Sequence, residues 1–136
     1  MISLIIPVYN EEENIKLLHE KIANSLKDID YEIIYVDDGS TDESFNKLKE
    51  IKDSRTKIIK FRKNFGQTSA LQAGINNSKG EIIVTIDADL QNDPDDILKL
   101  IEKYNGIAIG KSDSKNVYLT FDNGYEAGYT AKILDV

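Results

Sequence analysis

A short apolar run that ends in two aspartates is the strongest constraint on the fold of this chain. The run 82–86 (Ile-Ile-Val-Thr-Ile) is too continuous to leave one face of a strand in water. It is therefore typical of an interior parallel strand that is covered on both faces. Asp87 and Asp89 follow it directly, and ligands of open α/β sheets bind at such carboxyl ends. The run predicts an α/β fold with its site at this strand end.

The spacing of the two aspartates suits a cation. Only Ala88 separates Asp87 from Asp89, so both carboxylates can turn toward one hard ion such as Mg²⁺ or Mn²⁺. An ion held there would bridge the phosphates of a nucleotide. The alternative is that the aspartates simply end the strand and cap the segment that follows.

Two further apolar runs stop at acidic or amide residues. One ends at Asp37 and Asp38, and Gly39 after them permits a tight turn. The other opens the chain and ends at Asn10, with three glutamates next. A carboxylate at such a position can accept hydrogen bonds from a base or a ribose. In a parallel sheet the three clusters converge on one edge.

Helix capping is a second interpretation of some of these residues. Asn10 with Glu13, and Ser40 with Glu43, have the spacing of capping boxes, and negative charge is favoured at helix N-termini in any case. Capping alone does not explain why three strands end in such clusters.

Between these motifs, strand and helix patterns alternate. We expect helices over about 11–27, 42–52, 67–77 and 94–104, and a strand near 57–61. This alternation predicts right-handed crossovers and a mainly parallel sheet in a three-layer α/β/α arrangement. The Gly-rich signatures of dinucleotide and P-loop sites are missing. His19, the only histidine, is expected to be a structural or surface residue and not a ligand.

Four motifs together resemble family 2 glycosyltransferases over about residues 1–104. They are Pro7-Val-Tyr-Asn-Glu11, Val36-Asp-Asp-Gly-Ser-Thr-Asp-Glu-Ser44, Arg62-Lys-Asn-Phe-Gly66 and Asp87-Ala-Asp-Leu-Gln91. The last two are similar to the subgroup that moves a hexose from a nucleotide sugar to a polyprenyl phosphate. The resemblance implies a GT-A fold, here incomplete, and an inverting transfer that uses Mg²⁺ or Mn²⁺.

The resemblance also implies roles for the motif residues. A nucleotide pocket would be lined by Pro7, Tyr9, Glu11, Asp38, Arg62 and Asp87, and a metal would be held by Asp89 and Gln91. Asp38 would accept a hydrogen bond from the base or ribose. Asp87 and Asp89 would carry the catalysis, Asp87 against the sugar or ribose and Asp89 through an ion that neutralises the diphosphate leaving group. Arg62 with Lys63 would contact phosphate, the alternative being a solvated basic turn.

The tail of the chain resembles another family. The segment 115–126 is similar to the first motif of polysaccharide deacetylases, in the form found in peptidoglycan deacetylases of spore formers. Asp122 would correspond to the catalytic base, while Asn123 replaces a common metal-binding aspartate and the expected histidine pair is missing. We therefore expect no deacetylase activity.

The tail suggests a chimera or a truncated product joined near residues 102–108. Residues 1–104 would form the nucleotide-sugar-binding half, and residues 105–136 a strand, turn and short helix packed on the same domain. The strand is expected over Val117 to Phe121.

Composition excludes some classes of protein. The net charge of −7, from 17 basic and 24 acidic residues, argues against a nucleic-acid partner. The chain has no cysteine, which is compatible with the cytosol. No basic region precedes the first apolar run, and no apolar stretch approaches the roughly 18 residues of a spanning helix. We therefore expect a cytoplasmic chain without a transmembrane segment, whose parent enzyme works at the inner face of the membrane.

Three hypotheses remain open from the sequence. The first is a glycosyltransferase domain that binds a UDP- or GDP-hexose with a divalent metal. The second is a nucleotide-binding module without turnover, and the third is a chimera in which neither parent activity survives. Metal-dependent nucleotide binding separates the third hypothesis from the others.

Overall fold

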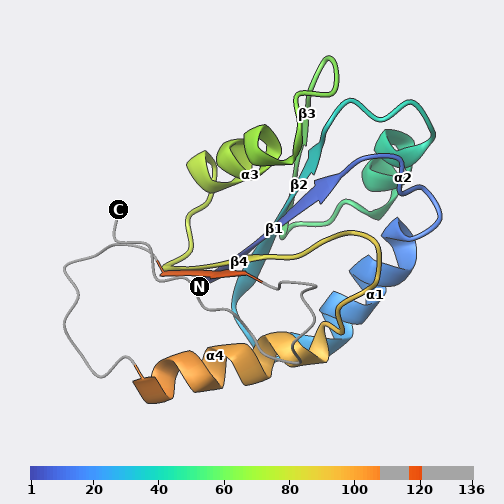
Figure 1. The fold of residues 1–136 in the computed structure, drawn as a ribbon. Helices are drawn as coiled ribbons and strands as arrows, with labels where there is room; N and C mark the ends of the chain where they lie inside the picture. Colours follow the sequence, from blue (N-terminus) through green and yellow to red (C-terminus); the bar gives the residue numbers. More distant parts are fainter. Residues whose placement is uncertain (108–116, 121–136) are drawn as a thin grey trace.

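The computed structural model describes residues 1–107 and 117–120, which form one sheet flanked by helices (Figure 1). The strands are β1 (Ile2–Val8), β2 (Tyr31–Asp37), β3 (Thr56–Lys60), β4 (Ile82–Thr85) and β5 (Val117–Thr120). The helices are α1 (Ile15–Ser25), α2 (Ser44–Ile51), α3 (Gln67–Asn76) and α4 (Asp95–Ile107).

The sheet is parallel and has the strand order β3-β2-β1-β4-β5. Its central strand is β1, in which Ile2 is paired with Tyr31 of β2 on one side and with Ile82 of β4 on the other. The carboxyl ends of β1, β2 and β4 therefore lie at one edge. The predicted α/β class and the parallel sheet are confirmed.

Helices cover both faces of the sheet (Figure 1). Alternate side chains of β1 divide between the two sides, since successive residues of a strand point to opposite faces. Leu4 and Ile6 belong to the large core beneath α1, α2 and α4, whereas Ile5 packs with Leu71 of α3 on the other face. This two-sided burial explains why the strand sequences are apolar without a break.

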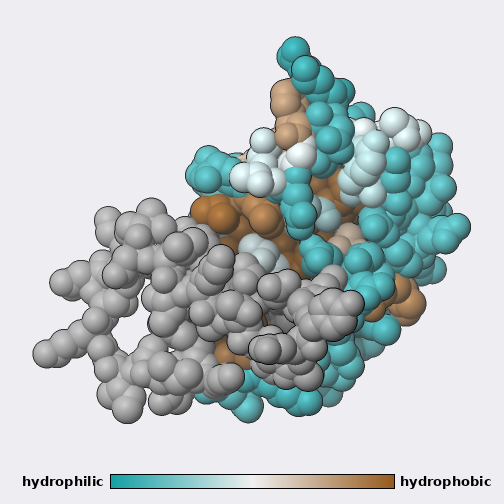
Figure 2. Space-filling view, in the orientation of Figure 1, coloured by the Kyte–Doolittle hydropathy of each residue, from teal (hydrophilic) through white to brown (hydrophobic). Residues whose placement is uncertain are grey.

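α3 lies directly on the sheet because of a glycine. A Cβ at Gly74 would come within 2.4 Å of Cγ2 of Ile5, so no larger residue fits without a shift. In the space-filling view, hydrophobic residues show beside α3 over the sheet, while hydrophilic residues cover α1 and α2 (Figure 2).

The helices begin later than the capping patterns predict. α1 starts at Ile15 instead of about residue 11, and α2 starts at Ser44 instead of about residue 42. The N-cap residues Asn14 and Glu43 make no side-chain capping hydrogen bond. The two predicted capping boxes are wrong, because the side chains of Asn10 and Ser40 bond to the neighbouring loop instead, as described below.

The expected tail strand is present as β5, which pairs in parallel with β4 at Ile82 and Val117. The other tail predictions, including Asp122, Asn123 and the short helix, lie outside the described residues.

Candidate functional site

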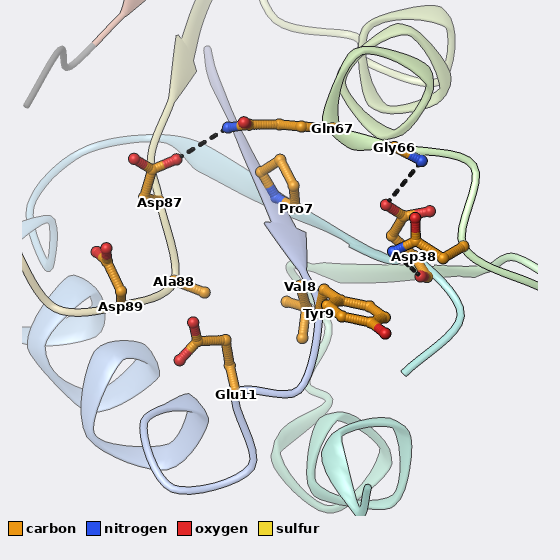
Figure 3. Close-up of a pocket in the computed structure, with 11 residues that line it drawn as sticks. Pro7, Val8, Tyr9, Glu11, Asp38, Gly66, Gln67, Asp87, Ala88 and Asp89 are labelled. Carbon is orange, nitrogen blue, oxygen red and sulfur yellow. Dashed lines mark hydrogen bonds between the residues drawn. The ribbon is translucent and has the colours of Figure 1, made fainter. Parts of the chain in front are cut away.

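A cavity of about 430 Å³ opens at the edge where β1, β2 and β4 end (Figure 3). Residues from all three strand ends and from the start of α3 line it: Pro7, Val8, Tyr9, Glu11, Asp38, Asn64, Gly66, Gln67, Asp87, Ala88 and Asp89. The structure thus brings together the clusters that the sequence placed at three separate strand ends.

The lining divides into two sides (Figure 3). Asp87 and Asp89 follow β4 on one side, and Asp38 follows β2 on the other. The end of β1 lies between them and presents Tyr9, whose side chain is 46% exposed. A ligand in the cavity can therefore contact Asp38 on one side and Asp87 and Asp89 on the other.

Asp38 is buried and holds the loop that leads into α3. Its Oδ1 accepts a hydrogen bond from the backbone N–H of Phe65 at 2.8 Å, and its Oδ2 accepts one from Gly66 at 3.1 Å. The side chain of Asn64 donates to the Asp38 carbonyl at 3.2 Å. Each carboxylate oxygen keeps a further lone pair for a ligand, so Asp38 both lines the cavity and fixes its wall.

Gly39 makes this wall possible. Its φ of +70° lies in the left-handed region, and a Cβ there would come within 2.3 Å of the carbonyl carbon of Lys63. The sequence predicted the tight turn but gave no signal of this contact with a loop 24 positions away in the chain.

The loops after β1 and β2 are bonded to each other. The N–H of Asn10 donates to Oγ of Ser40 at 2.9 Å, and Oδ1 of Asn10 accepts from the N–H of Thr41 at 2.8 Å. The N–H of Glu11 donates to Oγ of Ser44 at 2.8 Å. We call these contacts the loop clasp. It fixes the position of Glu11, which lines the cavity.

Two acidic side chains extend the clasp. The N–H of Glu12 donates to Oδ2 of Asp42, and the N–H of Glu43 donates to Oε2 of Glu12. Burial would raise the pKa of Asp42, but hydrogen bonds from Ser44 and Glu12 outweigh it and hold that pKa below its ordinary value. Asp42 is therefore an ionised acceptor at neutral pH.

The two aspartates after β4 have local partners of their own. Oδ1 of Asp87 accepts a hydrogen bond from Nε2 of Gln67 at 3.2 Å (Figure 3). Oδ1 of Asp89 accepts one from the N–H of Gln91 at 3.1 Å. Leu90, between Asp89 and Gln91, has a φ of 62°, a strained conformation that is found at functional sites. Sequence reasoning missed Gln67, although its place as the first residue of α3, after Gly66, was visible.

The charge of the cavity indicates what it can bind. Its lining holds four carboxylates and no lysine, arginine or histidine, so an anionic ligand needs a cation to enter with it. Within the described residues, no three His, Cys, Asp or Glu side chains gather closely enough to hold a metal. Two carboxylates suit Mg²⁺ or Mn²⁺, ions that commonly take one or two protein carboxylates and complete their shell with water and substrate phosphate.

Other predicted site residues do not line the cavity. Arg62, Lys63 and Gln91 are exposed and are not among its lining residues, so their contacts with phosphate or metal stay predictions. His19 is structural in this arrangement, since Nδ1 lies 2.8 Å from the hydroxyl of Tyr35 and Nε2 lies 3.3 Å from Asp53.

Comparison with known proteins agrees with this geometry. The sequence model of glycosyl transferase family 2 matches residues 3–125. The chain is 45% identical over 105 residues to the undecaprenyl-phosphate 4-deoxy-4-formamido-L-arabinose transferase of Proteus mirabilis (strain HI4320), covering 74% of this chain and 32% of that protein. It is 38% identical over 133 residues to the putative glycosyltransferase CsbB of Bacillus subtilis (strain 168), covering 95% of this chain and 34% of that protein. The chain thus spans about a third of the length of these relatives.

A solved structure shares the fold. The crystal structure of S. aureus TarS 1-349 in complex with UDP-GlcNAc matches with a TM-score of 0.58 and 22% identity, covering 85% of this chain and 38% of that chain. The described part of the present chain contains no helix that is long and apolar enough to cross a membrane.

These matches correct the interpretation of the tail. The family match continues to residue 125 and the alignment with the Bacillus protein covers 95% of the chain, so both pass the junction predicted near residues 102–108. The matches give no support to a deacetylase-like tail or to a chimera. A short motif around Asp122 was too little sequence to establish a second family.

Proposed function

The chain belongs to glycosyl transferase family 2, and from that premise we propose that it forms the donor half of a site that transfers a hexose from UDP or GDP to a polyprenyl phosphate. The donor would bind with Mg²⁺ or Mn²⁺, and the sugar would be transferred with inversion. The name of the Proteus relative, an undecaprenyl-phosphate transferase, supports the choice of acceptor. A lipid-linked acceptor also implies work at the inner face of a membrane.

The observation that carries the proposal is the division of the cavity into two sides. Asp38 and Tyr9 can serve a nucleoside, because a carboxylate accepts hydrogen bonds from base N–H or ribose hydroxyl groups and an aromatic ring can stack on a base. Asp87 and Asp89 occupy the other side, where a diphosphate would need a cation. The distribution of charge therefore fits a nucleoside diphosphate with its metal better than a neutral metabolite.

The protein residues mainly bind and orient the donor. Asp38 holds the cavity wall, the loop clasp holds Glu11, and Gln67 fixes the orientation of Asp87. When bound, the metal supplies charge neutralisation for the diphosphate leaving group. A phosphate acceptor is already anionic at neutral pH, so the site needs little general-base assistance.

Binding without turnover is the second candidate function. It requires only the cavity lined by Asp38, Asp87 and Asp89. Transfer to a polyprenyl phosphate, or hydrolysis of the sugar nucleotide, separates the two candidates.

The first test is a calorimetric titration of the purified chain with UDP and with GDP, each with and without Mn²⁺. We expect metal-dependent binding of one nucleotide. Asp89→Ala should raise the Kd by about tenfold, or about 1.4 kcal/mol, only when Mn²⁺ is present. The matched control is Asp28→Ala, which removes an exposed carboxylate outside the cavity. An Asp89→Ala chain that bound as tightly as the wild type in Mn²⁺ would disprove the metal assignment.

A further inference from the structure

Charge is unevenly distributed along this acidic chain. Residues 44–64 contain eight basic and two acidic residues, a net charge of +6. The rest of the chain contains nine basic and 22 acidic residues, a net charge of −13. A total of −7 therefore conceals one strongly cationic segment.

The fold collects this segment at one margin of the molecule. It comprises α2, β3 and the loop between β3 and α3, and β3 is the edge strand of the sheet. Seven of its cations are exposed: Lys47, Lys49, Lys52, Arg55, Lys60, Arg62 and Lys63. We call these seven the basic edge. Figure 2 shows a hydrophilic surface over α2 and along the projecting loop that follows β3.

Most charges of the basic edge are not neutralised by carboxylates. Among these seven cations, Lys47 has a carboxylate oxygen within 4.0 Å, that of Glu50, and the described structure gives none for the other six. Lys49 of α2 and Lys60 of β3 instead approach the same ring, with Nζ atoms 5.0 and 4.3 Å from the centroid of Phe45. Two ammonium groups from separate elements are thus held close together and face solvent.

An apolar ring stands at one end of the basic edge. Phe65 is 55% exposed, packs edge-on against Phe61 and has Nζ of Lys63 at 5.1 Å from its centroid. Its neighbours Asn64 and Gly66 line the cavity. Exposed aromatic rings among lysines are typical of surfaces that lie at a membrane interface.

We propose that the basic edge and Phe65 dock this chain on an anionic phospholipid surface. Five of the seven cations are lysines, whose strongly hydrated point charges suit mobile head groups better than fixed bidentate partners. The acidic remainder opposes docking weakly, because charges more than about 8 Å from the surface are largely screened at physiological salt. The benefit of docking rests on the proposed function, since it would bring the cavity wall at Asn64 to the surface that holds a lipid-linked acceptor.

The test is vesicle flotation of the purified chain at about 0.1 M NaCl. Vesicles of phosphatidylcholine are compared with vesicles that also contain phosphatidylglycerol. We expect binding to the anionic vesicles alone, and its loss as salt is raised toward about 1 M. Lys49→Gln, Lys52→Gln and Lys60→Gln combined should weaken binding by about 100-fold, and Phe65→Ser should weaken it at each salt concentration at which the wild type still binds.

A matched triple variant controls for total charge. Lys16→Gln, Lys21→Gln and Lys27→Gln remove the same charge from exposed positions in and just after α1, and should leave vesicle binding within about twofold of wild type. Equal loss in both triples, or equal binding to both kinds of vesicle, would overturn the proposal. Concentration-dependent dimerisation that the first triple abolishes, without vesicle binding, would overturn it in favour of contact between the basic edge and the acidic surface of a second copy.

The nucleotide titration separates this inference from the proposed function. A chain that floats with anionic vesicles but binds neither UDP nor GDP would retain the docking surface and refute the donor site. A chain that binds nucleotide with Mn²⁺ but ignores anionic vesicles would do the reverse.

Discussion

Asp38 couples one side of the cavity to the fold. Its two oxygens accept the N–H groups of Phe65 and Gly66, and hydrogen bonds to a charged group contribute about 1.5–3 kcal/mol each. We predict that Asp38→Ala lowers the free energy of unfolding by about 2–4 kcal/mol and also weakens nucleotide binding. Urea denaturation and calorimetry measure the two effects.

A gentler variant distinguishes the two roles of Asp38. Asp38→Asn keeps one acceptor oxygen, so it should lose less stability than Asp38→Ala while still impairing the loop. Asn64→Ala, which removes a donor to the Asp38 carbonyl, should cost about 1 kcal/mol. Full stability in Asp38→Ala would show that the loop does not depend on this carboxylate.

For single residues, the sequence predicts which side chains belong to the site better than it predicts their hydrogen-bond partners. Asp38, Asp87 and Asp89 were predictable because each follows an apolar strand. Gln67 and the amides of Phe65 and Gly66 were not, since they lie 20 to 28 positions away from the carboxylates they contact. No local pattern encodes such a distance.

At the scale of elements, the loop clasp replaces two expected helix caps. Asn10 has a φ of 52°, and its side chain accepts from Thr41 and Asp42 of the neighbouring loop. Asn10→Gly keeps access to this backbone conformation and loses only the side-chain contacts. Asn10→Ala adds about 1 kcal/mol of left-handed strain, so we predict that it destabilises the chain by about 2–3 kcal/mol and more than Asn10→Gly does.

Thermal unfolding of the two variants checks this order. Ser54→Ala, at an exposed loop position, is the control and should change stability by less than about 0.5 kcal/mol. If Asn10→Ala proved no less stable than Asn10→Gly, the backbone conformation of Asn10 would not be important for the clasp.

A buried polar network connects the strands at their amino ends, at the edge of the sheet opposite the cavity. Glu32 of β2 accepts from Oγ of Ser3 and from the N–H of Lys79, both at 2.7 Å, and Nζ of Lys57 lies 3.2 Å away. Burial would raise the pKa of Glu32, but these partners outweigh it, so the pKa lies below its ordinary value of 4.5. The charged form is therefore the one that the folded chain prefers.

This shift predicts acid sensitivity. A lowered pKa contributes stability above the unfolded value of 4.5, and that stability is lost as pH falls through the folded pKa. Glu32→Gln should cost about 1–3 kcal/mol at neutral pH. Denaturation curves of wild type and variant should converge below about pH 4.5, and parallel curves down to acid pH would contradict the prediction.

For the whole molecule, the alternation of strands and helices predicts the class and the layers. It does not predict the strand order, because β1 and β4 are joined only through contacts between residues about 80 positions apart. The tail also shows what local sequence can and cannot predict. The position of its strand was predictable from local sequence, whereas its family assignment required the alignment of most of the chain.

Nucleotide and Mn²⁺ should stabilise the whole domain only when both are present. At 100 times the Kd, a ligand adds about 2.7 kcal/mol to the free energy of unfolding, which corresponds to a rise in Tm of about 5–15 °C for a domain of this size. We predict this rise with nucleotide plus Mn²⁺, and little change with either alone. Scanning calorimetry tests it, with AMP as the monophosphate control.

The central position of β1 has a consequence for how the chain acquires its site during folding. β1 and β2 can pair soon after synthesis, whereas β4 must close a loop of most of the domain before Ile82 meets Ile2. Such distant pairings form late and are slow. Asp87 and Asp89 therefore join Tyr9 and Asp38 at a late stage of assembly. Metal-dependent nucleotide binding would consequently mark chains in which β4 has joined the sheet, and detachment of β4 would abolish it before the first strands separate.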